Sequence, residues 1–101
     1  TQIFYADKHY SFDGVKDMMK YYFDHKENIT KILVRDYYSQ KTISAKDAYY
    51  VVGSNVYGPM GNELIAFESK RDATAFLMDH KGKKILPFNK ITKKLVYSLD
   101  D

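Results

Sequence analysis

The sequence predicts an α+β fold: one compact domain of two pseudo-repeated ββαβ halves, with antiparallel or mixed sheets and two main helices. Its 101 residues are 45% hydrophobic and 16% aromatic, which suits a single core. Two segments align on an Asp-His pair and indicate an internal duplication: HYSFDGVKDMMKYYFDH (9–25) and LIAFESKRDATAFLMDH (64–80). The domain is therefore expected to span 1–101, with halves of about 1–44 and 45–101.

In both segments a short strand ends in phenylalanine, an acidic residue follows, and an apolar helical stripe comes next. The stripes recur at i, i+3, i+4 and i+7, the spacing of one helix face. They consist of Met18, Tyr21, Tyr22 and His25 in the first segment and Ala73, Phe76, Leu77 and His80 in the second. A period that occurs only twice indicates a pseudo-symmetric pair rather than a solenoid.

In the first half, a tight hairpin of two strands precedes the helix, at Gln2–Ala6 and Lys8–Phe12. The helix is expected to begin at Asp13 or Gly14, where carboxylates suit the positive end of the dipole, and to end near 26–28. The run Ile29–Tyr38 follows as a central strand.

In the second half, the strand pair is Tyr49–Gly53 and Glu63–Phe67. Ser69, with Asp72 three residues later, predicts a capped helix start, and Gly82 predicts a left-handed stop. A strand over Ile85–Phe88 follows, and Leu95–Leu99 is expected to form one more.

The composition excludes several classes of function. The chain has no cysteine, which rules out disulfides, thiolate zinc sites, iron–sulfur ligation and cysteine nucleophiles. No apolar run is long enough for a membrane span, so the fragment is expected to be soluble. No phosphate cradle, HExxH or GxSxG motif occurs, and Ser54 fits a turn better than a nucleophile, so we expect no enzyme.

The net charge of +3 comes mainly from lysines after residue 80: Lys81, Lys83, Lys84, Lys90, Lys93 and Lys94. Nucleic-acid modules usually combine such a basic face with aromatic side chains placed to stack on bases. Here the tyrosines follow the apolar periodicity, which favours solvated lysines and no nucleic-acid partner. Oligonucleotide binding by the basic tail stays open as a weaker alternative, and it would decline steeply with salt.

One loop carries a possible metal chemistry. Met60 stands between Pro59 and Gly61, so it is expected on a turn between the strands of the second half. Thioether sulfur prefers Cu(I) over harder divalent ions. Methionine is also a common gap-filler in cores, so Met60 is either a Cu(I) ligand or a hydrophobic latch.

The histidines at the helix ends leave the same alternatives. His25 and His80 occupy matching positions, where an imidazole interacts well with the negative end of the helix dipole. Metal ligation is the other interpretation, although neither helix offers a second donor at i+4. The candidate metal residues are therefore Met60 and His80. The remaining methionines, Met18, Met19 and Met78, are expected to pack in the core.

The block DAYYVVGSNVYGPMGNELIAFESKRDATAFLMDHKGKKILPF resembles the NosL family, copper-binding accessory lipoproteins of nitrous oxide reductase maturation. FDGVKDMMKYY (12–22) and ILVRDYYSQKTISAKDAYYVVGS (32–54) are similar to the same family in order and spacing. The resemblance implies a duplicated ββαβ fold and a Cu(I)-binding protein of the periplasm or outer cell envelope, lipid-anchored in its precursor. It further implies ABC-type or β-helical assembly proteins, and ultimately nitrous oxide reductase, as partners.

The chain departs from the family pattern at its start. Family members carry a Cys-Gly-Met segment near the mature N-terminus, whereas this chain begins TQIFYADKHYSFDG and has no cysteine. We interpret it as a fragment trimmed past that leader, so that Met60 would complete a Cu(I) site with donors that this chain lacks.

The rival hypothesis is a metal-free interaction module of the cell envelope. Tyrosine is enriched at protein interfaces, and a tyrosine-rich edge would then form the docking surface. Its members are Tyr37, Tyr38, Tyr49, Tyr50 and Tyr57.

Overall fold

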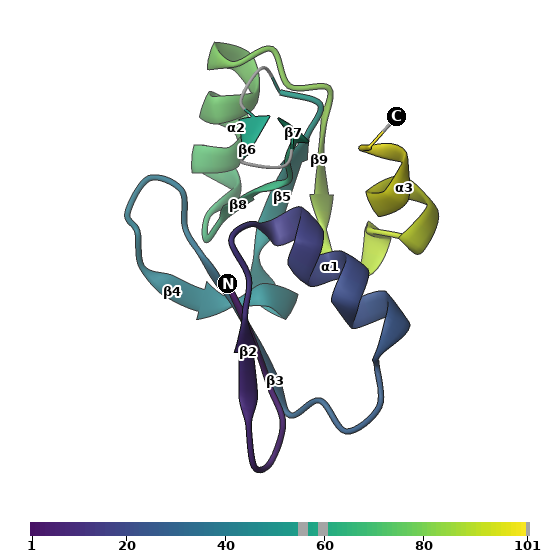
Figure 1. Cartoon of the computed structure of the whole chain (residues 1–101). Coiled ribbons are helices and arrows are strands. Elements are labelled where there is room, and N and C mark those ends of the chain that lie inside the picture. The colour runs from purple at the N-terminus through teal and green to yellow at the C-terminus, as the bar shows by residue number, and fades with distance from the viewer. Residues whose placement is uncertain (55–56, 59–60, 101) are drawn as a thin grey trace.

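The structure, a computed structural model, describes residues 1–54, 57–58 and 61–100, with side chains described for 1–54 and 63–100. The first half contains β1 (Gln2–Phe4), β2 (His9–Ser11), α1 (Val15–Asp24), β3 (Lys31–Arg35) and β4 (Thr42–Ser44) (Figure 1). The second half contains the 3-10 turn η1 (Ala45–Asp47), β5 (Tyr49–Val52), β6 (Tyr57–Gly58), β7 (Gly61–Asn62), β8 (Ile65–Phe67), α2 (Lys70–Asp79), β9 (Lys84–Pro87), η2 (Phe88–Lys90) and α3 (Lys93–Ser98).

The two sheets share one topology. The order is β2-β1-β3-β4 in the first sheet and β8-β5-β9 in the second, and every pair is antiparallel. In the first half β1 lies between β2 and β3, the strand that follows α1. In the second half β5 lies in the same way between β8 and β9, the strand that follows α2. The predicted compact α+β fold with antiparallel sheets and two main helices is confirmed, and the strand order agrees with the predicted ββαβ halves. Beyond the repeat, β4 adds an edge strand to the first half and the β6–β7 hairpin is inserted into the second.

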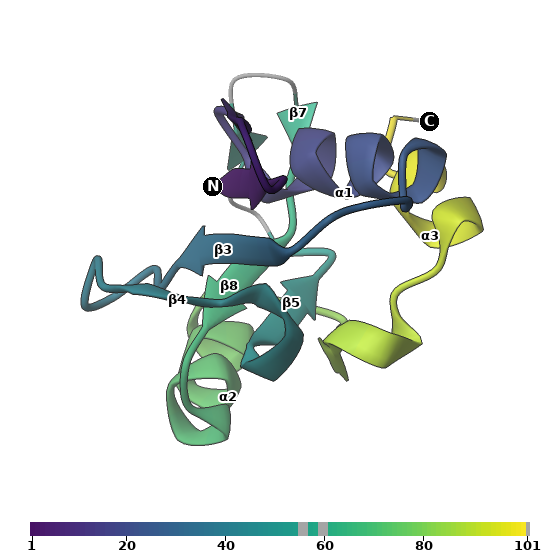
Figure 2. The ribbon, with the colours of Figure 1, turned by 90° about the horizontal axis from the view of Figure 1, so that it is seen from below.

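Strand β5 lies between two apolar cores. Successive side chains of a strand point to opposite faces, and here Tyr50 and Val52 face the larger core while Val51 faces the smaller one. Met18 and Met19 of α1 are fully buried in the larger core, as predicted, and α2 covers the smaller core with Ala73 and Phe76. Figure 2 shows the result, with α1 and α2 on opposite sides of β3, β5 and β8.

The predicted start of α2 is confirmed, and its end is built differently. Ser69 Oγ accepts the backbone N–H of Asp72 at 3.1 Å. At the other end, the left-handed residue is Lys81, with φ of 56°, and the N–H of Gly82 donates to the carbonyl oxygen of Leu77 at 2.8 Å. A Cβ at Gly82 would lie 2.8 Å from Val51 Cγ1, so this position requires glycine for close approach rather than for its backbone angle.

The strand predicted over Leu95–Leu99 is wrong, because this segment forms α3. Thr92 Oγ1 accepts the N–H of Leu95 at 3.1 Å and begins the helix. Val96 is buried, and Leu95 and Leu99 pack against the larger core from the same side. The spacing i, i+1 and i+4 fits a helix face, and Lys93 and Lys94, which precede Leu95, are exposed.

Two further expectations need correction. The strand predicted over Ile29–Tyr38 is limited to Lys31–Arg35, because the chain turns at Asp36. Met78 does not pack in the core, since it is 74% exposed on α2. Within the described residues, no helix combines the length and the apolar character needed to cross a membrane.

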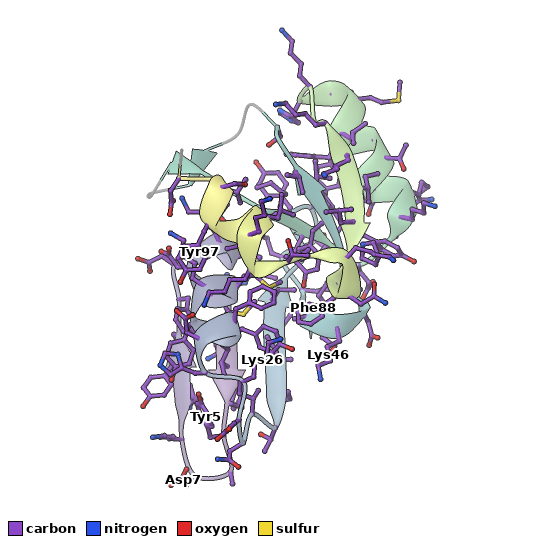
Figure 3. All side chains as sticks on the ribbon, turned by 90° about the vertical axis from the view of Figure 1, so that its right-hand side faces the viewer. Tyr5, Asp7, Lys26, Lys46, Phe88 and Tyr97 are labelled. Atoms are coloured by element: carbon purple, nitrogen blue, oxygen red, sulfur yellow. The ribbon has the colours of Figure 1, made fainter. Side chains whose placement is uncertain are left out.

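Helix α3 is fastened to α1 by polar contacts. Tyr97, labelled in Figure 3, donates its hydroxyl to Asp24 Oδ2 at 2.9 Å, and Lys93 Nζ lies 2.9 Å from Asp24 Oδ1. Asp100 pairs with Lys16 and Lys20 of α1. The C-terminal segment is thereby held against the first helix of the chain.

Candidate metal site at the inserted hairpin

Strands β6 and β7 form a separate two-stranded hairpin in which Tyr57 is paired with Asn62 and Gly58 with Gly61. By sequence, Pro59 and Met60 stand between these strands. Met60 lies outside the described residues, so its assignment as Cu(I) ligand or hydrophobic latch stays a prediction.

Glu63, which directly follows β7, links the base of the hairpin to α1. Its Oε1 accepts the backbone N–H of Lys16 at 2.6 Å and that of Leu64 at 3.0 Å. Lys16 lies in the first turn of α1, where free N–H groups and the helix dipole favour a carboxylate. Burial raises the pKa of Glu63, and this effect exceeds the lowering by the two N–H groups.

Gly14 makes room for this carboxylate. A Cβ at position 14 would overlap Glu63 Oε2. Gly14 has φ of −144°, an extended conformation open to any residue, so its backbone alone does not require glycine. Any side chain at position 14 would instead displace the Glu63 carboxylate from its place.

Lys16 places a cation beneath the same turn. It is 1% exposed, and its Nζ lies 3.0 Å from Asp100 Oδ1. Lys20 binds the other oxygen of Asp100, and the hydrogen bonds from Lys20 and Lys16 hold the pKa of Asp100 below its usual range. The first turns of α1, the base of the hairpin and the C-terminal segment therefore meet in one charged cluster.

His80, the second candidate ligand, belongs to an aromatic cluster at the end of α2. Its ring stacks on Phe76 with centroids 4.4 Å apart, and its backbone N–H donates to the Phe76 carbonyl oxygen at 2.9 Å. Phe67 and Tyr37 also contact Phe76, with centroids 5.2 Å and 5.0 Å away. His80 thus packs its ring on an aromatic cluster, as one of the two interpretations expects. Its role as a metal ligand stays a prediction.

No cluster of metal ligands is present among the side chains of 1–54 and 63–100. No three histidine, aspartate or glutamate groups come together there in a way that could hold an ion. Met60 lies outside these residues, so this finding does not test its predicted role as a ligand.

The tyrosine-rich edge is only partly exposed. Tyr50 is fully buried and donates its hydroxyl to the Ala45 carbonyl oxygen at 2.6 Å, so its predicted place in a docking surface is wrong. Tyr37 and Tyr38 are 40% and 46% exposed. Tyr57 has no described side chain.

A cavity of about 870 Å³ opens between the β1–β2 turn and the C-terminal end of α1. Figure 3 labels Tyr5, Asp7 and Lys26 at this end of the molecule. His25 is its only imidazole within the described lining, and His25 Nδ1 lies 3.0 Å from the Tyr21 carbonyl oxygen. A single nitrogen donor does not make a metal site.

The sequence did not indicate Glu63 or Gly14 as parts of a site. Glu63 looked like the first residue of a strand and Gly14 like a helix start. The available signal was glycine at an N-cap without a side-chain cap of its own, which leaves the first turn to be capped from elsewhere.

Comparison with known proteins decides the family. The NosL family model matches residues 1–96. The chain belongs to the NosL family. The curated copper-binding lipoprotein NosL of Stutzerimonas stutzeri is 41% identical over 54 residues, which cover 54% of this chain and 28% of that relative.

Two solved NosL structures share the fold. The crystal structure of the copper chaperone NosL from Shewanella denitrificans matches with a TM-score of 0.83 and 25% identity, over 92% of this chain and 78% of that one. The solution structure of apo-NosL from Achromobacter cycloclastes matches with a TM-score of 0.65 and 32% identity, over 94% and 86%. The resemblance stated from sequence is confirmed. The Stutzerimonas relative is named as copper-binding and the Shewanella protein as a copper chaperone, rather than as enzymes, in agreement with the expectation of a non-catalytic protein.

Proposed function

We propose that this NosL protein binds Cu(I) as cargo and passes it to an acceptor in the cell envelope. The observation that carries the proposal is the structural match, over 92% of the chain, to a protein described as a copper chaperone. The family match over residues 1–96 agrees with it. Cu(I) bound by few soft ligands can be held tightly and still leave by ligand exchange, as a chaperone requires.

In this proposal Met60 supplies a thioether donor from the inserted hairpin, and His80 is the second candidate donor within the chain. The chain contains no cysteine. The remaining soft donors come from a leader segment of the kind that family members carry, or from the acceptor.

An anaerobic Cu(I) competition titration against a colorimetric chelator tests the proposal, using the chain with and without an added N-terminal leader that carries the Cys-Gly-Met segment of the family pattern. With the leader present, Met60→Ala should weaken Cu(I) affinity by about tenfold or more, as expected for loss of one of two or three donors. Met78→Ala is the matched control, because Met78 is 74% exposed and lies on α2. Equal affinities of the two variants would remove Met60 from the site.

The acceptor side is proposed from the family. The copper would reach the copper centres of nitrous oxide reductase through ABC-type or β-helical assembly proteins, with the chaperone lipid-anchored in the periplasm or outer envelope. The lipoprotein name of the Stutzerimonas relative supports this location. Transfer is tested by mixing the Cu(I)-loaded protein with copper-free reductase and following the metal by size-exclusion chromatography; copper that stays with the chaperone would argue against it.

A metal-free interaction module is the second candidate, and one observation favours it. Tyr37 and Tyr38 lie side by side, half-exposed, with Tyr37 packed on Phe76 and Tyr38 on Phe67 at centroid distances of 5.0 Å and 5.2 Å. Rigid exposed aromatics are typical interface anchors. If the chain with its leader binds no Cu(I) while Tyr37→Ala weakens binding to an assembly protein, this function is preferred.

A further inference from the structure

We propose that Glu63 is a positioning residue for the metal-binding hairpin: its carboxylate fixes the base of β6–β7 to the first turn of α1 and so sets where the hairpin stands. This inference rests on the proposed Cu(I) function, because the hairpin flanks Met60 in sequence.

The need for such a contact follows from the topology. The β6–β7 hairpin is a sheet of its own and is hydrogen-bonded to neither of the larger sheets among the described strands. A two-stranded hairpin is marginally stable alone in water. Contacts of the described residues at its ends therefore help to set its position.

Glu63 provides the contact at the end that follows β7. One oxygen accepts an N–H from α1 and another N–H from Leu64, at 2.6 Å and 3.0 Å. Leu64 is buried in the larger core, so the carboxylate joins the hairpin to two rigid parts of the fold. Hydrogen bonds to an ionised acceptor are about twice as strong as neutral ones.

The surroundings are shaped for this carboxylate. Gly14 leaves the space that Glu63 Oε2 fills, and Lys16 places a buried cation in the same turn. Residues 14 and 63 lie in different halves of the repeat, so the contact exists only in the assembled fold. A carboxylate serving merely as a surface charge would need neither feature.

The test compares Glu63→Ala with Ser69→Ala in the full chain. Both variants remove one side-chain acceptor from a helix N-terminus, but Ser69 caps α2 and does not contact the hairpin residues described. Amide hydrogen exchange of the metal-free protein is the first readout. Glu63→Ala should speed exchange of the Lys16 and Leu64 amides about tenfold, the loss expected for a charge-assisted hydrogen bond, and it should also speed exchange in β7. Ser69→Ala should leave these amides unchanged at a similar loss of melting temperature.

Cu(I) affinity of the chain with the added Cys-Gly-Met leader is the second readout. We expect Glu63→Ala to weaken it about tenfold, Glu63→Gln to weaken it less because one amide oxygen can still accept, and Ser69→Ala to leave it unchanged. If Glu63→Ala is poorly folded, Gly14→Ala replaces it, since the added methyl displaces the carboxylate while Glu63 remains.

The two proposals fail in different ways. Absence of Cu(I) binding by the unmodified protein overturns the proposed function, and the exchange readout still decides whether Glu63 holds the hairpin. If Met60→Ala weakens Cu(I) binding but Glu63→Ala matches Ser69→Ala in both readouts, the positioning role alone is overturned.

Discussion

The carboxylate of Asp36 connects the two halves of the molecule: its Oδ2 accepts the backbone N–H of Glu68 at 2.7 Å. Its Oδ1 accepts the N–H groups of Tyr38 and Ser39, each at 2.9 Å. Asp36 is only 2% exposed. The turn after β3 is therefore locked to the residue that follows β8.

We predict that Asp36→Asn lowers the free energy of unfolding by about 2 to 3 kcal/mol, because the amide cannot satisfy N–H donors on both of its sides. Urea denaturation of both proteins measures the difference. Asp7→Asn, at the exposed tip of the β1–β2 turn, is the control and should change stability little. An Asp36→Asn loss as small as that of the control would show that the connection contributes little.

The same carboxylate predicts an acid-sensitive fold. Burial raises the pKa of Asp36, but the hydrogen bonds from the N–H groups of Glu68, Ser39 and Tyr38 together lower it by more. The pKa of Asp36 therefore lies below its usual value. A carboxyl whose pKa is lower in the folded state stabilises the protein above its unfolded pKa, and this contribution disappears as the pH falls through the folded pKa. Stability measured from about pH 5 to about pH 3 should fall more steeply for the unmodified protein than for Asp36→Asn. Parallel curves would contradict this.

Substitution of Asp100, which pairs with Lys16 and Lys20, should weaken the attachment of α3 to α1. Asp100→Asn takes one negative charge from Lys16 and Lys20, and Lys16 is buried. We expect a lower melting temperature, by a few degrees, and faster amide exchange in α3. Lys94→Gln, on an exposed position of α3, is the matched control. Unchanged exchange in Asp100→Asn would mean that the Asp24 contacts and the apolar contacts of Val96 hold α3 without Asp100.

Two substitutions at the C-terminal end of α2 should have opposite effects on the stability of the protein. Lys81→Gly should be neutral or stabilising by up to about 1 kcal/mol, because glycine adopts the positive φ at that position without strain. Gly82→Ala should destabilise by about 1 to 3 kcal/mol, because its methyl would crowd Val51. Thermal unfolding of the two variants measures these changes in stability. A Gly82→Ala protein as stable as the original would show that Val51 of β5 can shift to accommodate the methyl group.

Much of the fold was predictable where local chemistry and periodicity agree. The stripe from Ala73 to Leu77 and the cap at Ser69 both specify α2. The prediction of Gly82 as the left-handed residue is wrong, because Lys81 adopts that conformation, and the sequence does not show that β5 passes close to Gly82. Leu95–Leu99 failed as a strand because its few apolar residues fit both periods, and the cap at Thr92 was overlooked.

The site was less predictable, since its contacts are long-range. Glu63 and Lys16 are 47 residues apart, and neither carries a local motif for the other. Asp36 likewise looked like part of a strand, although its role depends on Glu68, 32 residues later. Met60 was indicated by turn chemistry and family resemblance, and its assignment awaits the titration.

The common strand order of the halves also has a consequence for protein engineering. The β6–β7 hairpin leaves the repeat between the strands that correspond to β1 and β2, so the short β1–β2 turn is its counterpart in the other half. This architecture accepts a long excursion at that junction without altering strand pairing. Transplanting residues 53–63 into the β1–β2 turn is therefore expected to keep the strand pairing of the first sheet.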